Sequence, residues 1–118
     1  MADGDPVRIS ICHCLPCQRR TGSVFAAQAR FPRDQVHDIQ GRRSTYVRAG
    51  DSGNRATFSF CPDCGGTVFW EPETMPDFIM VATGAFADST FPPPTVSVYE
   101  NRMHAWVMQA GALPIDHN

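Results

Sequence analysis

Lysine is absent from this chain of 118 residues, and every basic side chain is an arginine. A mechanism in which a lysine amine forms a Schiff base with a carbonyl substrate is therefore excluded. Arginine remains, and its planar guanidinium is well suited to holding carboxylates through two parallel hydrogen bonds. The composition thus removes one route to carbonyl chemistry and keeps a means of binding an acidic substrate.

Long apolar runs are also missing. The longest, such as "FIMVA", have the length of a β-strand, whereas a membrane-spanning helix needs about eighteen or more apolar residues. The beginning of the sequence has no apolar core of the kind that secretion signals carry. We therefore expect a cytoplasmic protein, in which thiols stay reduced and clustered cysteines bind a metal or take part in catalysis.

The chain has no excess of positive charge, because its 10 basic residues face 12 acidic ones and the net charge is -2. Nucleic-acid-binding domains carry a strongly basic surface, so nucleic acid is not an expected partner. The charges are unevenly spread, since residues 1–55 hold nine of the arginines and residues 56–118 hold only one.

Length and composition predict one compact domain. Hydrophobic residues make up 42% of the chain and charged residues 19%, which is ordinary usage for a globular protein. A chain of this length can bury one core but is short for two. We therefore expect a single domain that spans residues 1–118.

Short extended segments separated by turn residues predict a mainly β fold. Alternating or β-branched runs indicate strands at residues 7–11, 23–31, 44–49, 56–60, 67–71, 78–84 and 95–100. The intervening segments are rich in Gly, Pro, Asn and Asp, which favour turns. One helical turn is expected near residues 16–21, with Pro16 at its first position and Gly22 as its left-handed cap.

Three of the five cysteines, Cys12, Cys14 and Cys17, lie within six residues of sequence. In a strand, residues two apart project to the same side, so Cys12 and Cys14 point together and His13 points away as a core or solvent side chain. The turn introduced by Pro16 can bring Cys17 back to them. Because three converging thiolates repel one another without a cation, we predict a zinc site at the three cysteines.

A site with three protein ligands keeps one coordination position open, and open zinc sites are typical of catalysis. Three thiolates leave the site with a net charge of about -1, which makes a weak Lewis acid that is poor at generating hydroxide. A thiol arriving from a substrate would still be deprotonated by coordination and remain nucleophilic. The cluster therefore indicates activation of a substrate sulfur, with Cys12, Cys14 and Cys17 as catalytic residues.

The second cysteine group is "CPDCGG", in which Cys61 and Cys64 flank a Pro-Asp turn. This pattern is typical of a zinc knuckle, where a tight turn directs two sulfurs at one metal. Gly65 or Gly66 can adopt the positive φ that lets backbone N–H groups approach the sulfurs.

The spacing of the cysteines leaves a second interpretation open. Two C-x-x-C knuckles could form one closed structural zinc site from Cys14, Cys17, Cys61 and Cys64, with Cys12 unused. The chain would then be a non-catalytic interaction module whose zinc ion serves folding only.

Four segments together carry a resemblance to a known family: "CHCLPCQRRTGSVF", "FCPDCGGTVFW", "VATGAFAD" and "VYENRMHAWV". From about residue 5 to residue 106 the sequence resembles the glutathione-dependent formaldehyde-activating enzymes, a family that includes centromere protein V. The resemblance implies a β-tent of small antiparallel sheets that binds two zinc ions. Cys12, Cys14 and Cys17 would hold the catalytic zinc, and Cys61 and Cys64 would supply half of a structural site.

The same resemblance implies an activity. Members of the family are carbon–sulfur lyases that add glutathione to formaldehyde and form S-hydroxymethylglutathione. Arg19 or Arg20, next to the cysteine cluster, would hold a carboxylate of glutathione. Thr21, Gly22 and Ser23 match the family's T-G-S segment and would line the same pocket.

The sequence departs from the family at its N-terminal end. Relatives carry an earlier Gly-rich segment with another C-x-C, which completes the structural site, and the eleven residues before Cys12 contain no cysteine. Either the true start of the protein lies upstream, or the domain lacks that strand. In the second case the second zinc ion would be missing, or water, other ligands or another subunit would have to complete its site. An unpaired strand edge near Val7 would then favour a homodimer.

Overall fold

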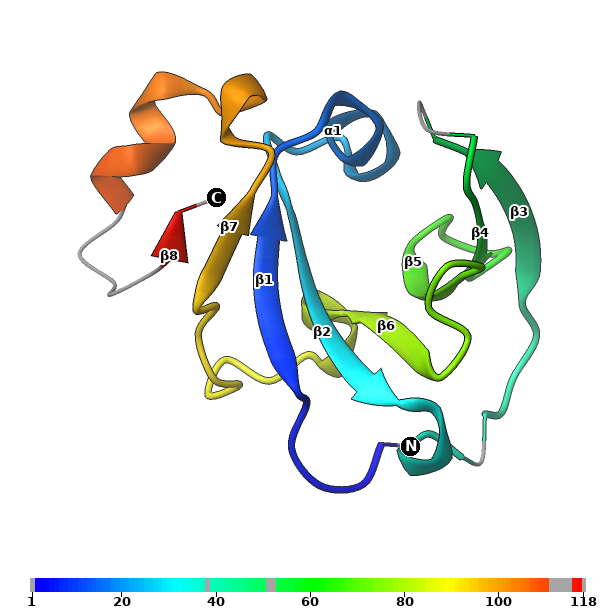
Figure 1. The fold of residues 1–118 in the computed structure, drawn as a ribbon. Helices are drawn as coiled ribbons and strands as arrows, with labels where there is room; N and C mark the ends of the chain where they lie inside the picture. The colour runs from blue at the N-terminus through cyan, green and yellow to red at the C-terminus, as the bar shows by residue number, and fades with distance from the viewer. Residues whose placement is uncertain (1, 38, 51–52, 111–115, 118) are drawn as a thin grey trace.

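The computed structural model describes residues 2–37, 39–50, 53–110 and 116–117. Its elements in chain order (Figure 1) are β1 (Arg8–Cys12), α1 (Leu15–Thr21), β2 (Ala26–Pro32), η1 (Arg33–Gln35), β3 (Ser44–Ala49), β4 (Arg55–Phe60), β5 (Thr67–Pro72), β6 (Phe78–Ala82), η2 (Thr83–Phe86), β7 (Val96–Val98), η3 (Glu100–Arg102), η4 (Ala105–Ala110) and β8 (Asp116–His117). The mainly β class with one short helix is confirmed. All seven expected strands are present, and β8 is an eighth that the sequence pattern did not indicate.

The strands of the described residues form one mixed sheet in the order β3-β4-β5-β6-β2-β1-β7-β8. Neighbouring strands are antiparallel except for β1–β7 and β7–β8, which are parallel. The unpaired edge expected near Val7 is not present, because β1 lies between β2 and β7. The Val7 N–H also donates to the carbonyl oxygen of Arg30 at 2.8 Å. The edges of the sheet are β3 and β8 instead.

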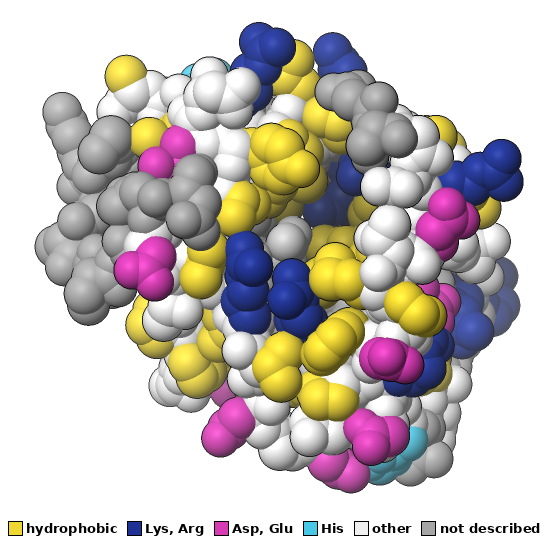
Figure 2. Space-filling model, in the orientation of Figure 1, with side chains coloured by type: hydrophobic (Ala, Val, Ile, Leu, Met, Phe, Trp, Pro, Cys, Tyr) yellow, Lys and Arg dark blue, Asp and Glu magenta, His cyan; other side chains and the backbone are white. Residues whose placement is uncertain are grey.

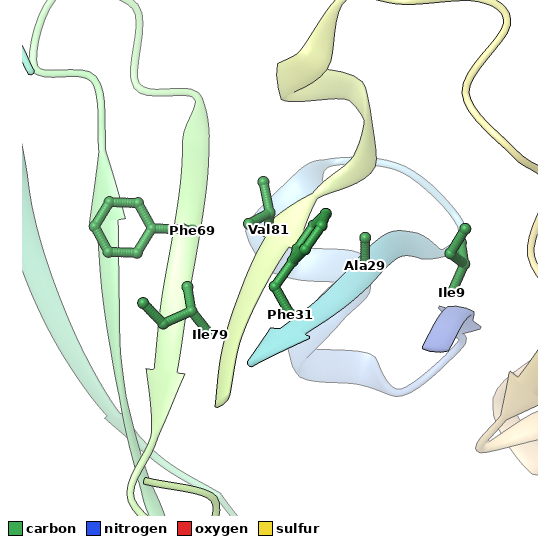
Figure 3. Packing of buried hydrophobic residues seen from close by; sticks show 6 residues of the cluster. All are labelled: Ile9, Ala29, Phe31, Phe69, Ile79 and Val81. Carbon is green, nitrogen blue, oxygen red and sulfur yellow. The ribbon is translucent and has the colours of Figure 1, made fainter. Parts of the chain in front are cut away.

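One face of the sheet carries the larger apolar cluster. Its members come from β1, β2, β5 and β6 and are shown in Figure 3: Ile9, Ala29, Phe31, Phe69, Ile79 and Val81. Because side chains alternate along a strand, the residues next to them in sequence lie on the opposite face. Phe69 pairs with Val81 on the first face, and Trp70 pairs with Met80 on the second.

The second face carries a smaller cluster, Phe58, Trp70 and Met80, which are cross-strand neighbours from β4, β5 and β6. Figure 1 shows that the sheet is strongly bent: β7, β1 and β2 stand on one side, β3 and β4 on the other, and β6 crosses between them. Helix α1 follows β1 directly and lies between these two groups of strands. None of the helices in the described residues has the length and apolar character needed to cross a membrane.

Candidate metal centre and cleft

The three clustered cysteines meet where β1 passes into α1. Cys12 is the last residue of β1, and Cys14 is the N-cap of α1, where its Sγ accepts a hydrogen bond from the Cys17 N–H at 3.4 Å. Pro16 lies in the first turn, and Gly22 ends the helix in the left-handed region at φ 66°, as expected. The junction thus holds the three residues together through local backbone geometry.

The ligand atoms of Cys12, Cys14 and Cys17 all lie within 4.8 Å of one another. Tetrahedral zinc with Zn–S bonds of about 2.3 Å places its sulfurs roughly 3.8 Å apart, so small side-chain movements suffice to share one ion. Cys12 and Cys17 are buried, and Cys14 is partly accessible. Three sulfur donors this close together fit a zinc ion.

The environment of the cluster favours negative charge on Cys17. Hydrogen bonds from Cys12 and Cys14 lower the pKa of Cys17 to about 5, and the positive charges of Arg20 and Arg48 act in the same direction. The hydrogen bond with Cys17 and burial raise the pKa of Cys12, and burial above all raises that of Cys14. The protein alone therefore stabilises one thiolate in the cluster.

Two arginines are held beside the sulfurs by aromatic rings. The Arg20 guanidinium carbon lies 4.5 Å from the ring centroid of Trp70 and 5.1 Å from that of Phe58. The Arg48 guanidinium lies 4.7 Å from the Phe58 centroid, and the two rings stack with centroids 5.5 Å apart. Burial lowers the pKa of Arg20, but a guanidinium titrates so far above neutral pH that it keeps its charge. The rings thus fix two positive charges near Cys17.

The cysteines and arginines line a cleft of about 570 Å³ on the second face of the sheet. Its walls include four arginines, Arg20, Arg48, Arg55 and Arg102, and the described lining residues include no Asp or Glu. Figure 2 shows dark-blue basic side chains inside the hollow between the two halves of the molecule. The electrostatics of the cleft therefore suit an anionic ligand.

Cys61 and Cys64 form a separate knuckle in the connection between β4 and β5. Gly65 takes a positive φ of 77°, as expected, and the Gly66 N–H donates to Cys64 Sγ at 3.5 Å. Backbone N–H groups of Cys64 and Asp63 lower the pKa of Cys61. This local geometry agrees with the predicted zinc knuckle.

The knuckle does not join the first cluster. Among the described residues, the only group of three or more potential ligands that could share a metal is Cys12, Cys14 and Cys17. The closed site that the spacing left open, made from both C-x-x-C pairs, is therefore not formed in this structure. Metal binding by Cys61 and Cys64 stays a prediction from the sequence.

The predicted substrate-binding residues separate into two groups. Arg20 lines the cleft, whereas Arg19, Thr21, Gly22 and Ser23 are exposed and are not among its lining residues. The Thr21 hydroxyl donates to the Cys17 carbonyl at 2.8 Å, and the Ser23 N–H donates to Thr21 Oγ1 at 3.1 Å. These contacts end α1 and steady the Cys17 backbone, and a direct role in binding stays a prediction.

His13 is a core residue. The sequence had left open whether its side chain lies in the core or in solvent. Its side chain is fully buried, and Nε2 is hydrogen-bonded to Ser97 Oγ at 2.9 Å. It therefore links the β1–α1 junction to β7 rather than joining the sulfur cluster.

Several cleft residues were missed by sequence reasoning: Gln28, Arg48, Asn54, Arg55, Tyr99, Asn101 and Arg102. They come from segments far apart in the chain. Tyr99, Asn101 and Arg102 lie in the segment "VYENRMHAWV" that carries part of the family resemblance, but no role was predicted for them from the sequence, and the other four lie outside the quoted segments. The sequence offered only the alternation of side chains along the predicted strands; the structure then pairs Arg48 with Ala56, which places Arg48 on the same face as Phe58.

The comparison with known families agrees with this arrangement. A search of the curated proteins found no match to the chain. The family described as glutathione-dependent formaldehyde-activating enzyme matches residues 1–106. The matched residues include both cysteine motifs, strands β1 to β7 and the four arginines of the cleft. The chain therefore belongs to the glutathione-dependent formaldehyde-activating enzyme family.

Proposed function

We propose that this chain is a carbon–sulfur lyase that adds a thiol, glutathione or a close analogue, to formaldehyde or another small aldehyde. The observation that carries the proposal is the convergence of Cys12, Cys14 and Cys17 within 4.8 Å beside a cleft lined by four arginines. Family membership supports the same reaction class. The free thiols of all five cysteines suit a reducing compartment such as the cytoplasm.

Cys12, Cys14 and Cys17 would hold a zinc ion, which when bound would supply the positive charge that favours the thiolate form of an incoming thiol. Arg20 and Arg48 add to that charge, because both lower the pKa of a thiol in the cluster. Phe58 and Trp70 are almost completely buried and hold the guanidiniums in place. The charges are therefore oriented before the substrate arrives, which reduces the reorganisation needed during the reaction.

The addition itself requires no oxidant. The thiol sulfur forms a bond to the carbonyl carbon while the C=O π bond breaks, and the thiol proton passes through solvent to the new hydroxyl group. The cleft would contribute by holding the thiol with its sulfur at the cysteine cluster and by stabilising the negative charge that develops on the carbonyl oxygen.

Replacing Cys14 with alanine tests the proposal. Cys14→Ala removes one of three sulfur ligands, so we expect it to lose bound metal and glutathione affinity together. Elemental analysis measures metal per chain, and calorimetry measures glutathione binding. The matched control is Cys64→Ala, which should keep glutathione affinity because Cys64 lies outside the cluster. Glutathione binding that persists after the metal is removed would contradict the proposal.

Cobalt substitution separates an open catalytic site from a purely structural one. If a substrate thiol occupies the fourth position, adding glutathione to the cobalt-loaded protein should shift its absorption spectrum. Product formation from glutathione and formaldehyde, followed by NMR, then tests the lyase reaction itself. An unchanged spectrum and no product would favour the non-catalytic interaction module.

A further inference from the structure

The four arginines of the cleft fall into two pairs. Arg20 and Arg48 stack on aromatic rings beside the cysteine cluster. Arg55 and Arg102 also line the cleft, but their side chains are exposed at its rim. The inner pair acts on the cysteine cluster, and the outer pair is left for other parts of a ligand.

The outer arginines come from two segments that lie on opposite sides of α1 (Figure 1). Arg55 begins β4, and Arg102 ends η3. Figure 1 shows η3 on one side of α1 and the upper end of the β3–β4 hairpin on the other. The contacts agree with this placement: Gln18 of α1 is hydrogen-bonded to the Arg102 carbonyl, and the Arg20 guanidinium of α1 lies over the Phe58 ring of β4. Helix α1 therefore contacts both of the segments that carry the rim arginines.

Both sides of the rim are tied to the framework. The side-chain amide of Gln18 in α1 donates to the Arg102 carbonyl at 3.1 Å, which fixes η3 against the helix. The Gly50 N–H donates to the Asn54 carbonyl at 2.7 Å, which fixes the backbone next to Arg55. The backbone next to each rim arginine is thus held by a hydrogen bond.

The rim arginines differ from other exposed arginines in their electrostatic surroundings. Arg33 forms an ion pair with Glu71 at 2.6 Å, and Arg42 forms one with Asp63 at 2.7 Å. The ion pairs of the described residues involve neither Arg55 nor Arg102, and the described residues that line the cleft include no acidic side chain. Their charges are therefore available to an anionic ligand.

We propose that Arg55 and Arg102 are specificity-determining residues that select thiols carrying a carboxylate on each side of the sulfur. This inference rests on the proposed function and adds to it the rule by which the cleft distinguishes one thiol from another. Glutathione has this layout, since its cysteine lies between a γ-glutamyl and a glycyl end that each bear a carboxylate. An extended tripeptide spans about 10 Å, so its two ends would lie toward opposite walls of the cleft.

A series of thiols tests the rule with the zinc-loaded wild-type protein. Calorimetry would compare glutathione, its glycine monoethyl ester, and cysteamine, which has no carboxylate. Because partly exposed ion pairs are individually weak, we expect a loss of about fivefold in affinity for each carboxylate removed. Equal affinity for glutathione and its ester would overturn the inference, while a cobalt shift with glutathione would leave the lyase proposal standing.

Two variants show which arginine binds which end of glutathione. Arg55→Gln and Arg102→Gln should each weaken glutathione binding by about fivefold. The ester lacks the glycyl carboxylate. The variant without the arginine that binds this carboxylate should therefore bind glutathione and the ester equally well, whereas the other variant should bind the ester more weakly than glutathione. Arg42→Gln is the matched control, since Arg42 is exposed but does not line the cleft.

The outcomes separate the two proposals. If Arg42→Gln weakens binding as much as the rim variants, the effect is one of overall charge and the inference is wrong. If affinity falls with each carboxylate removed but no product forms, the role of Arg55 and Arg102 is supported and the proposed lyase activity is wrong. If no thiol binds at all, both proposals fail. Circular dichroism checks that each variant is folded, and the wild-type thiol series decides the question should a variant unfold.

Discussion

At the scale of single residues, Phe58 connects stability to the site. Its ring is 2% exposed, stacks on Trp70, and contacts the guanidiniums of Arg20 and Arg48. One side chain therefore fills the core of the second face and also positions two charges beside the cysteines. A substitute for Phe58 must therefore match both its volume, to fill the core, and its aromatic face, to hold the guanidiniums.

Phe58→Ala should lower the free energy of unfolding by about 3–5 kcal/mol, since it removes a buried ring and leaves a cavity. It should also weaken glutathione binding, because Arg20 and Arg48 lose their support. Urea unfolding and calorimetry measure the two effects. Val47→Ala, at an exposed position of β3, is the control and should change stability by no more than about 0.5 kcal/mol. A stable Phe58→Ala protein would contradict the role given to this ring.

At the scale of elements, the β1–α1 junction creates the sulfur cluster. The helix begins at Leu15 directly after the Cys14 cap and ends at Gly22, whose N–H donates to the Gln18 carbonyl. Thr21 adds a hydrogen bond to the Cys17 carbonyl. Because Cys17 lies within this short helix, a distortion of the C-terminal cap would move the Cys17 backbone and with it one of the proposed metal ligands.

Gly22→Ala tests the importance of the cap. Gly22 has φ +66° and open space around its Cα, so an added methyl group causes backbone strain rather than a clash. We expect a loss of about 1 kcal/mol in stability and weaker metal retention. Gly84→Ala is the matched control, because Gly84 also has open space and lies outside the left-handed region. Thermal unfolding and metal competition assays measure the difference, and equal effects of the two substitutions would argue against the cap.

At the scale of the whole molecule, the fold gathers positive charge in a protein of net charge -2. The bent sheet brings arginines from α1, β3, β4 and η3 to one cleft. Exposed charges outside the cleft are partly neutralised by ion pairs such as Arg33 with Glu71. The attraction proposed for an acidic thiol would therefore be local and would not depend on the net charge.

Salt should consequently weaken glutathione binding more than cysteamine binding. Raising the ionic strength from about 0.05 M to about 0.5 M shortens the Debye length well below the dimensions of the cleft and screens the exposed arginines. Calorimetric titrations at several salt concentrations measure both affinities. The same salt dependence for both thiols would show that the arginines do not contact the carboxylates.

The sequence predicted much of the local structure. Gly22 and Gly65 adopt the left-handed conformations that their positions after Cys17 and Cys64 indicated. The strand at residues 44–49 has the expected bounds. By contrast, β8 is only two residues long, Asp116–His117, and has no alternating pattern by which it could be recognised.

The sequence alone determined the mainly β class and the close approach of Cys12, Cys14 and Cys17, because strand alternation, a proline-started turn and a glycine cap act over a few residues. The tertiary structure decided where the second cysteine pair lies, which strands form the edges, and that Arg48, Arg55 and Arg102 share a cleft with the cluster. These features depend on strand order and on the bend of the sheet. They arise from contacts between distant segments, which spacing along the chain does not specify.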